Sequence, residues 1–215
     1  GRASDHFLMY RDFKLDEADT AYQSYLRAES NPVYPFKIKL MRDALESVAE
    51  QAQLLPVPTV IRIMDPLFAK ADALVERYPD NYPLLITLNQ TKLIVARFGK
   101  KYLDGVESQI QKAIAFSPNR QQNYYALANF YLLNDRADDA KGTMQKAIEL
   151  DPASGDPFFQ AGLIAYRLTG KTDALPFFTK AAERGYRGEN KDEALMLGNF
   201  LGDAEYYDLS YESYR

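Results

Sequence analysis

Residues 121–154 read QQNYYALANFYLLNDRADDAKGTMQKAIELDPAS, and this stretch decides the expected fold. In its first half, apolar residues recur at intervals of three, one and three, which places them on one face of a helix. These residues are Tyr124, Leu127, Ala128 and Tyr131. A polar turn follows, and a second apolar stripe then runs through Ala140, Met144 and Ala147 until Asp151-Pro152 ends it. We therefore expect two antiparallel helices that pack closely at the small residues Ala128 and Ala140.

A four-residue motif within this stretch recurs at a fixed interval. Gln145-Lys146-Ala147-Ile148 lies 34 residues after Gln111-Lys112-Ala113-Ile114 and 34 residues before Thr179-Lys180-Ala181-Ala182. A period of this size is typical of a stacked helical array, in which each unit is too small to bury its own apolar face. The interval predicts an all-helical array of paired helices.

The unit resembles the tetratricopeptide repeat. In that family's pattern the first helix has a large residue, Leu, a small residue and an aromatic residue, and the second helix has Ala, an aromatic residue and Ala, followed by Pro. Only Met144 departs from that pattern in residues 121–154. Residues 155–188 match with Phe158, Ala161, Gly162, Ala165, Ala174, Phe178 and Ala181. There Gly185 takes over from the terminal Pro as the expected end of the helix. The resemblance implies an all-α fold, a right-handed superhelix of antiparallel helix pairs.

The resemblance weakens toward both ends of the sequence. We expect a single helical-repeat domain over 1–215, with divergent N-terminal helices at 1–58, degenerate repeats at 59–120, clear units at 121–154 and 155–188, and C-terminal capping helices at 189–215. Within the degenerate part, the apolar pattern predicts a helix over 82–98 that Gly99 ends. Asp65-Pro66 is either a kink inside a helix or the start of a new one, and the sequence leaves both readings open.

The composition argues against several classes of function. A formal net charge of −4 over 215 residues does not favour nucleic acid as a partner, because neutralising phosphates requires a basic face. No stretch reaches the roughly 18 to 20 apolar residues of a membrane span. The chain has no cysteine, a single histidine, His6, and no recognisable nucleophile or phosphate-binding motif. We expect a protein that is not an enzyme and that has no cofactor and no metal.

Binding is the function that remains. In tetratricopeptide arrays the first helices line the concave surface, and the resemblance assigns positions five, nine and twelve of each unit to it. These residues are Tyr125, Asn129, Leu132, Phe159, Leu163 and Tyr166, preceded by Thr91, Val95 and Phe98. Such an aromatic groove suits the capture of a peptide or helix. The alternative is that some of these side chains, Leu163 and Phe98 especially, pack into neighbouring repeats.

One ligand of this family is not expected. Members that bind chaperone tails hold the terminal carboxylate with a Lys at position five followed by an Asn at position nine. This chain keeps Asn129 but has Tyr125 at position five.

Two further functions stand as alternatives. The order of helices and repeats over roughly residues 10 to 55 is similar to the soluble C-terminal regions of some bacterial O-antigen ligases or polymerases. That resemblance implies an extracytoplasmic accessory domain, tethered to a membrane in the full-length protein, that binds a glycan. The absence of cysteine leans toward a periplasmic or cell-surface location in a bacterium over a cytoplasmic one. The other alternative is a self-assembling structural protein, in which the apolar ends of two arrays meet.

Overall fold

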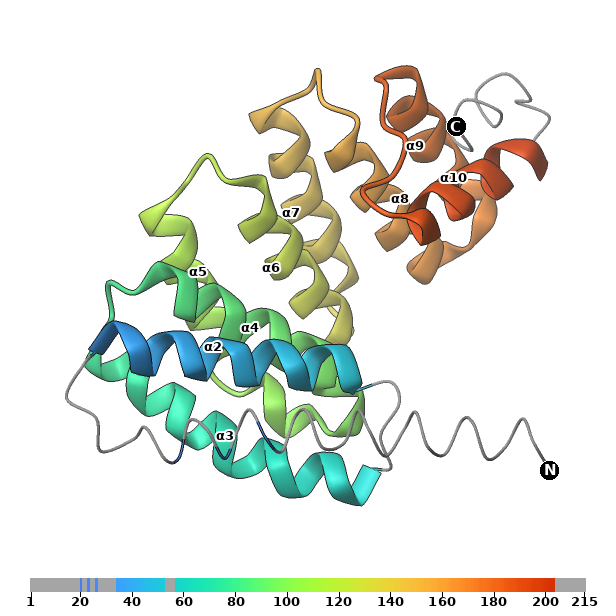
Figure 1. The fold of residues 1–215 in the computed structure, drawn as a ribbon. Coiled ribbons are helices and arrows are strands. Elements are labelled where there is room, and N and C mark those ends of the chain that lie inside the picture. Colours follow the sequence, from blue (N-terminus) through green and yellow to red (C-terminus); the bar gives the residue numbers. More distant parts are fainter. Residues whose placement is uncertain (1–19, 21–22, 24–25, 27–33, 53–56, 204–215) are drawn as a thin grey trace, which may run out of the picture. The chain divides into compact units, whose positions relative to one another are not determined.

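The computed structural model describes residues 20, 23, 26, 34–52 and 57–203, and every regular element within them is helical (Figure 1). In order, the elements are α2 (Tyr34–Gln51), α3 (Val57–Arg77), α4 (Tyr82–Val95), the 3-10 helices η1 (Ala96–Phe98) and η2 (Lys100–Leu103), α5 (Val106–Phe116), α6 (Gln121–Leu133), α7 (Ala137–Leu150), α8 (Asp156–Thr169), α9 (Lys171–Glu183) and α10 (Lys191–Asp203). The prediction of an all-α fold is confirmed. The helices expected before residue 34 and after residue 203, and His6, lie outside the described residues.

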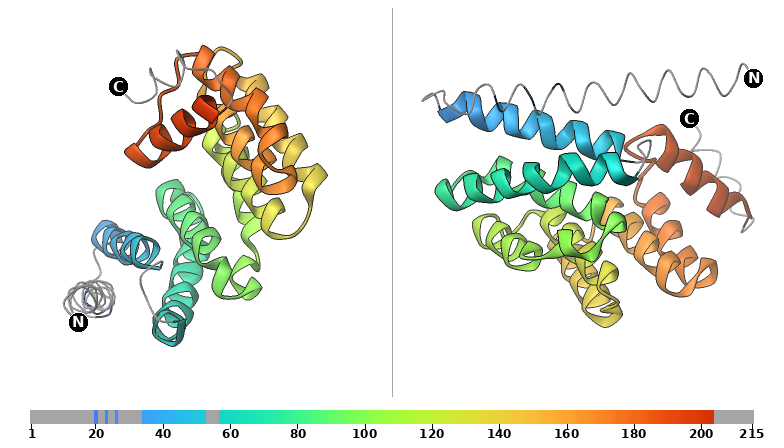
Figure 2. Two further views of the ribbon diagram at one scale, coloured as in Figure 1. Left: turned by 90° about the vertical axis from the view of Figure 1, so that its right-hand side faces the viewer. Right: turned by 90° about the horizontal axis from the view of Figure 1, so that it is seen from below.

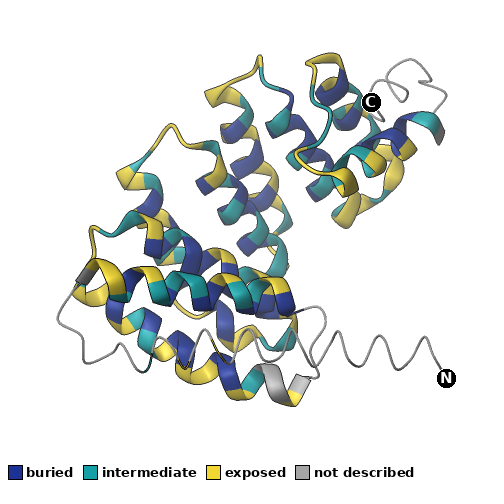
Figure 3. Ribbon diagram, viewed as in Figure 1, coloured by how far each residue is buried: buried dark blue, intermediate teal, exposed yellow. Residues whose placement is uncertain are grey.

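The chain divides into two compact units, residues 1–116 and residues 117–215. Each unit has an apolar cluster of its own, and Figure 3 shows the buried stripes along the helices of each. The assignment of the whole chain to one repeat domain stays a prediction.

In the first unit, α4 is surrounded by its neighbours. Leu84, Leu85 and Leu88 of α4 are almost fully buried. Met41 and Leu45 of α2 belong to the same cluster and are also fully buried. A helix that is apolar around most of its circumference must be covered on several sides, and α4 packs on α2, α3 and α5.

The helix predicted over 82–98 is confirmed, with a change of geometry near its end. Asn81 caps α4, because its side-chain oxygen accepts a hydrogen bond from the Leu84 amide at 3.0 Å. The α-helix runs to Val95 and tightens into the 3-10 turn of η1, after which Gly99 ends it as expected.

Pro66 lies inside α3, which is continuous from Val57 to Arg77, so Asp65 does not begin a new helix. Instead, the Asp65 carboxylate accepts hydrogen bonds from the Lys101 ammonium and the Tyr102 hydroxyl, each at 2.7 Å. The hydrogen bond from Lys101 is the largest of the effects that lower the pKa of Asp65. These contacts attach η2 to the middle of α3.

A charged pair links α3 and α4 in the same unit. The ammonium of Lys92, whose side chain is 5% exposed, lies 2.7 Å from the Asp72 carboxylate. Gln109 of α5 donates a further hydrogen bond to Asp72 at 3.1 Å. A buried ammonium without a partner is strongly destabilising, so the burial of Lys92 depends on Asp72.

The second unit contains the two clear repeats as antiparallel pairs, α6 with α7 and α8 with α9 (Figure 2). Ala128 and Ala140 are fully buried, as expected for the close approach of α6 and α7. In the next pair, Gly162 lies against Phe178, and a methyl group at Gly162 would come within 2.7 Å of that ring. Both pairs therefore depend on small residues in the first helix.

Two helix ends follow one geometry. At the end of α9, Gly185 has φ +80°, its amide donates to the Ala182 carbonyl, and the Tyr186 amide donates to the Ala181 carbonyl. This is the Schellman arrangement, and it confirms that Gly185 ends the helix. At the end of α6, Asp135 occupies the corresponding left-handed position with φ 60°.

Helix α10 closes the second unit. Leu197 and Leu201 of α10 are fully buried, and the Phe200 ring lies 4.5 Å from the Phe178 ring between centroids. The Tyr186 hydroxyl donates to the Glu193 carboxylate at 2.5 Å, which ties the start of α10 to the turn after α9. This helix covers the apolar face that α9 would otherwise leave open.

Candidate functional site

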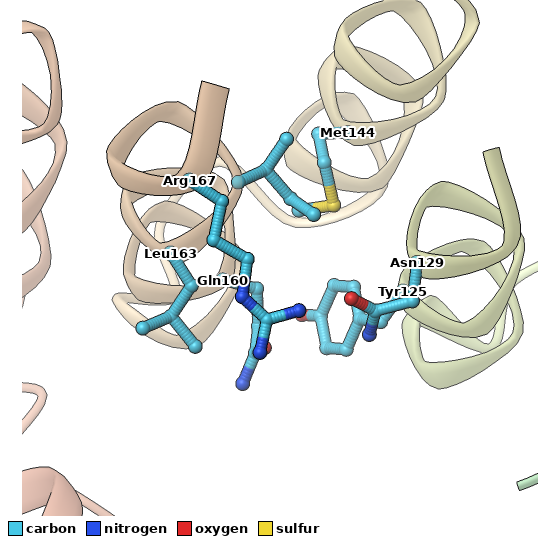
Figure 4. Close-up of a pocket in the computed structure, with 7 residues that line it drawn as sticks. Tyr125, Asn129, Met144, Gln160, Leu163 and Arg167 are labelled. Carbon is cyan, nitrogen blue, oxygen red and sulfur yellow. The ribbon is translucent and has the colours of Figure 1, made fainter. Parts of the chain in front are cut away.

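A small pocket of about 80 Å³ opens where α6, α7 and α8 meet (Figure 4). Its lining consists of Tyr125, Asn129, Met144, Gln160, Leu163, Ile164 and Arg167. On α6 the lining residues are four apart, and on α8 they are spaced by three and four, so each helix contributes one face.

Tyr125 is held in place from α8. It is 9% exposed, and its hydroxyl donates a hydrogen bond to the Asp156 carboxylate at 2.8 Å. Burial is the main cause, and the hydrogen bond to Asp156 the second, of a strongly raised pKa for Tyr125. The phenol therefore stays protonated and serves as a donor to Asp156, while its ring faces the pocket.

Polar groups from both sides surround an apolar base. In Figure 4 the Arg167 guanidinium and the Gln160 side chain extend from α8, and Asn129 reaches in from α6. Arg167 is exposed, and Asn129 and Gln160 are partly buried. None of these three side chains has a hydrogen bond or ion pair with another described residue. The pocket thus presents a cation and two amides that are available to a ligand.

Comparisons with known proteins bear on the fold. No family model matches the sequence, and no curated protein matches it. Among solved structures, TTC0263, a tetratricopeptide-repeat protein of Thermus thermophilus, matches with a TM-score of 0.54 at 16% identity, over 86% of this chain and 98% of that chain. MamA of AMB-1 matches with a TM-score of 0.49 at 18% identity, over 81% of this chain and 96% of that chain.

The chain has the tetratricopeptide-repeat fold. A further match, at a TM-score of 0.41 and 16% identity over 78% of this chain and 81% of the other, is YrrB, described as a tetratricopeptide-repeat protein with an unusual peptide-binding site. Proteins with the tetratricopeptide-repeat fold generally serve as interaction scaffolds, because stacked helix pairs present an extended concave surface.

Three of the residues that tetratricopeptide-repeat positions suggested lie together. Tyr125, Asn129 and Leu163, from positions five and nine of the two clear units, all line the pocket. Leu132 is partly buried and is not part of the lining. Tyr166 is 45% exposed and packs edge to face on Phe200, with ring centroids 5.1 Å apart.

Phe159 lies in the core of the second unit. It is fully buried, with the Tyr186 ring stacked at 4.7 Å and the Phe178 ring at 5.5 Å between centroids. Phe159 therefore presents no surface to a ligand in this structure.

The remaining suggested residues belong to the first unit. Thr91 and Val95 are buried there, and Phe98 is partly buried with the Arg97 guanidinium over its ring at 4.6 Å. Leu163, which the alternative reading assigned to packing, lines the pocket and is partly buried.

Sequence reasoning missed four residues of the lining: Met144, Gln160, Ile164 and Arg167. Gln160 and Arg167 lie three residues before and four residues after Leu163, so they share its helical face, and this spacing could have identified them. Among the residues that the structure describes, no group of three or more His, Cys, Asp or Glu side chains could hold a metal ion. In the same residues, no helix is both long and apolar enough for a membrane span.

Proposed function

We propose that this chain is a protein-interaction scaffold whose pocket binds a peptide segment through an acidic side chain and a neighbouring aliphatic one. The observation that supports this proposal is a set of polar groups around the apolar surface of Leu163 and Ile164. These groups, on Asn129, Gln160 and Arg167, have no partner among the residues that the structure describes.

The preference for an acidic residue rests on Arg167. A guanidinium offers donors in a planar fork that matches a carboxylate, and a hydrogen bond between two charged groups is stronger than a neutral one. Asn129 and Gln160 can donate to the same carboxylate from either side of the pocket. Tyr125 contributes its ring to the base, because its hydroxyl already donates to Asp156.

The preference for an aliphatic neighbour rests on the pocket's size and lining. A volume of about 80 Å³ admits only a small part of a ligand. The surface formed by Met144, Leu163 and Ile164 is apolar, so covering it with a ligand's aliphatic side chain removes that surface from water. We expect the rest of the peptide to lie along the exposed edges of α6 and α8.

A random dodecapeptide library displayed on phage and panned on the whole chain tests the proposal. We expect enriched sequences with an acidic residue beside an aliphatic one, and a loss of affinity of about 10-fold or more for Arg167→Glu. The matched control is Lys146→Glu, which reverses an exposed charge on α7 outside the lining of this pocket. Enriched peptides that bind Arg167→Glu as tightly as they bind the unchanged chain contradict the proposal.

Tyr125→Phe separates binding from folding. This variant keeps the ring and loses the hydrogen bond to Asp156. We expect it to lower the stability of the second unit by about 1 kcal/mol and to retain peptide affinity. If Tyr125→Phe instead abolishes binding while Arg167→Glu does not, the phenol and not the guanidinium recognises the ligand.

A further inference from the structure

A second cavity, larger than the pocket, lies on the other side of the contact between α7 and α8. Its volume is about 480 Å³, and its lining comes from α7, α8 and α9. Met144 and Ile164 line both cavities, so these two buried side chains form the partition between them. We call this second cavity the α7–α9 cleft.

Helices α7 and α9 both pack on α8 but have no extensive packing with each other, and the cleft lies between them. Its base is formed by small residues of α8, including Ala161 and Ala165, and its apolar walls include Ile148 of α7 and Phe177 of α9. The volume lies in the range of about 300–1,000 Å³ that is typical of pockets that bind ligands.

Gly142 occupies the α7 wall of the cleft. A methyl group added there would meet nothing within 4 Å, so the packing of this chain does not require glycine at that position. Glycine in a helix interior is less stable than alanine, because it loses more conformational freedom on folding. The glycine therefore leaves this part of the α7 wall open, with room for a side chain of an occupant.

The rim of the cleft carries opposite charges on its two walls. Lys141 lies on α7 and Asp173 lies in the first turn of α9, and both are exposed. Neither forms an ion pair or a hydrogen bond with another residue in the part of the chain that the structure describes. An occupant with an acidic group on one side and a basic group on the other would complement both.

We propose that the α7–α9 cleft binds an amphipathic helix of a partner protein. The helix places one or two apolar side chains over Ala161 and Ala165, an acidic residue near Lys141 and a basic residue near Asp173. The lining of α7 runs from residue 141 to 148, about 10 Å along the axis, which accommodates apolar side chains four residues apart on the partner. A groove between two helices that are both antiparallel to α8 suits a third helix. This surface shares only Met144 and Ile164 with the peptide pocket and takes a different ligand, so the inference goes beyond the proposed function.

The test uses a displayed library of 14-residue amphipathic helices with two Leu fixed four residues apart and flanking positions varied among Glu, Lys and Gln, panned on the whole chain. Gly142→Leu places a side chain in the cleft, and Gly142→Ala is the matched control, because both replace glycine by a better helix former. We expect enriched helices to bind the unchanged chain and Gly142→Ala alike and to lose at least 10-fold in affinity for Gly142→Leu.

The charges supply the second measurement. The double reversal Lys141→Glu with Asp173→Lys should select helices with the opposite order of acidic and basic flanks. Lys146→Glu, which reverses an exposed charge on α7 outside the lining of both cavities, should leave selection unchanged. Binding that survives Gly142→Leu, or enrichment without any order of charges, overturns the inference. So does saturable binding of the apolar dye 8-anilinonaphthalene-1-sulfonate in the cleft without helix enrichment, which indicates a small-molecule site. Self-association that Gly142→Leu abolishes, measured by sedimentation, indicates a second copy as the occupant and also overturns it.

Discussion

The contact between Gly162 and Phe178 predicts that one substitution changes sign with its background. A methyl group at Gly162 would lie 2.7 Å from one ring atom of Phe178 and no more than 3.0 Å from two others. That ring cannot easily move, because it is fully buried between Phe159 and Phe200, with centroids 5.5 Å and 4.5 Å away. Gly162→Ala therefore adds volume where the core has none to spare.

Two opposing effects set the magnitude. Adding a methyl group to a tightly packed core typically costs about 1–3 kcal/mol, and replacing glycine by alanine inside a helix contributes about 1 kcal/mol of stability. We expect Gly162→Ala to destabilise the second unit by up to about 2 kcal/mol. Phe178→Ala alone should cost about 3–5 kcal/mol. With the ring removed, Gly162→Ala should stabilise by about 1 kcal/mol, which gives a coupling of about 1–3 kcal/mol.

Native-state hydrogen exchange read by mass spectrometry suits this measurement, because it reports local free energies of opening even when two units unfold separately. Amides of α8 and α9 should lose protection in Gly162→Ala and regain it in the double variant relative to Phe178→Ala. Amides of α2 and α4 should keep theirs, because they belong to the other unit. Equal effects of Gly162→Ala in both backgrounds would refute the steric argument.

Three further predictions concern a carboxylate, a buried ion pair and a helix end. The pKa of Asp65 is lowered in the folded chain, so its carboxylate stabilises the fold at pH values above its pKa in the unfolded chain, and this contribution is lost as the pH falls below about 4. Urea titrations at several pH values should show the loss, and Asp65→Asn should remove that part of the pH dependence. Asp72→Ala should destabilise the first unit by about 3 kcal/mol, because Lys92 is left buried without its partner. Lys92→Met should cost less than half as much in the same urea titration, and equal losses would contradict this argument. Gly185→Ala should destabilise α9 by about 1 kcal/mol, because φ +80° is strained for alanine, and an unchanged thermal midpoint would count against that reading.

The helices of the second unit could be predicted because each local signal agrees with the others. The 34-residue interval, the small residues Ala128 and Ala140, and the end at Gly185 all indicate the same two helix pairs, and the structure has them. The local signal was weaker at Asp65-Pro66, because a proline there is compatible with either a continuous helix or the start of a new one. The structure has a continuous α3, in which the Asp65 carboxylate accepts hydrogen bonds from η2.

The site could be predicted only in part, because tertiary contacts decide which side chains remain at the surface. Phe159 occupies a position that faces the groove in the family's pattern, yet Tyr186, from the turn after α9, stacks on it and completes its burial. No spacing rule connects residues so far apart in sequence. Arg167 was missed for a different reason, since the family positions omit it although it shares a face with Leu163. The predictions of a glycan ligand, a membrane tether, an extracytoplasmic location and self-assembly stay predictions.

The shared wall of Met144 and Ile164 means that the two cavities are not independent. Methionine is an unbranched and adaptable side chain, so an occupant on one side that displaces it alters the shape offered on the opposite side. Any such influence must act equally in both directions, because linked binding equilibria are reciprocal. If both proposed partners bind, a shift of Met144 caused by one of them would therefore change the affinity for the other.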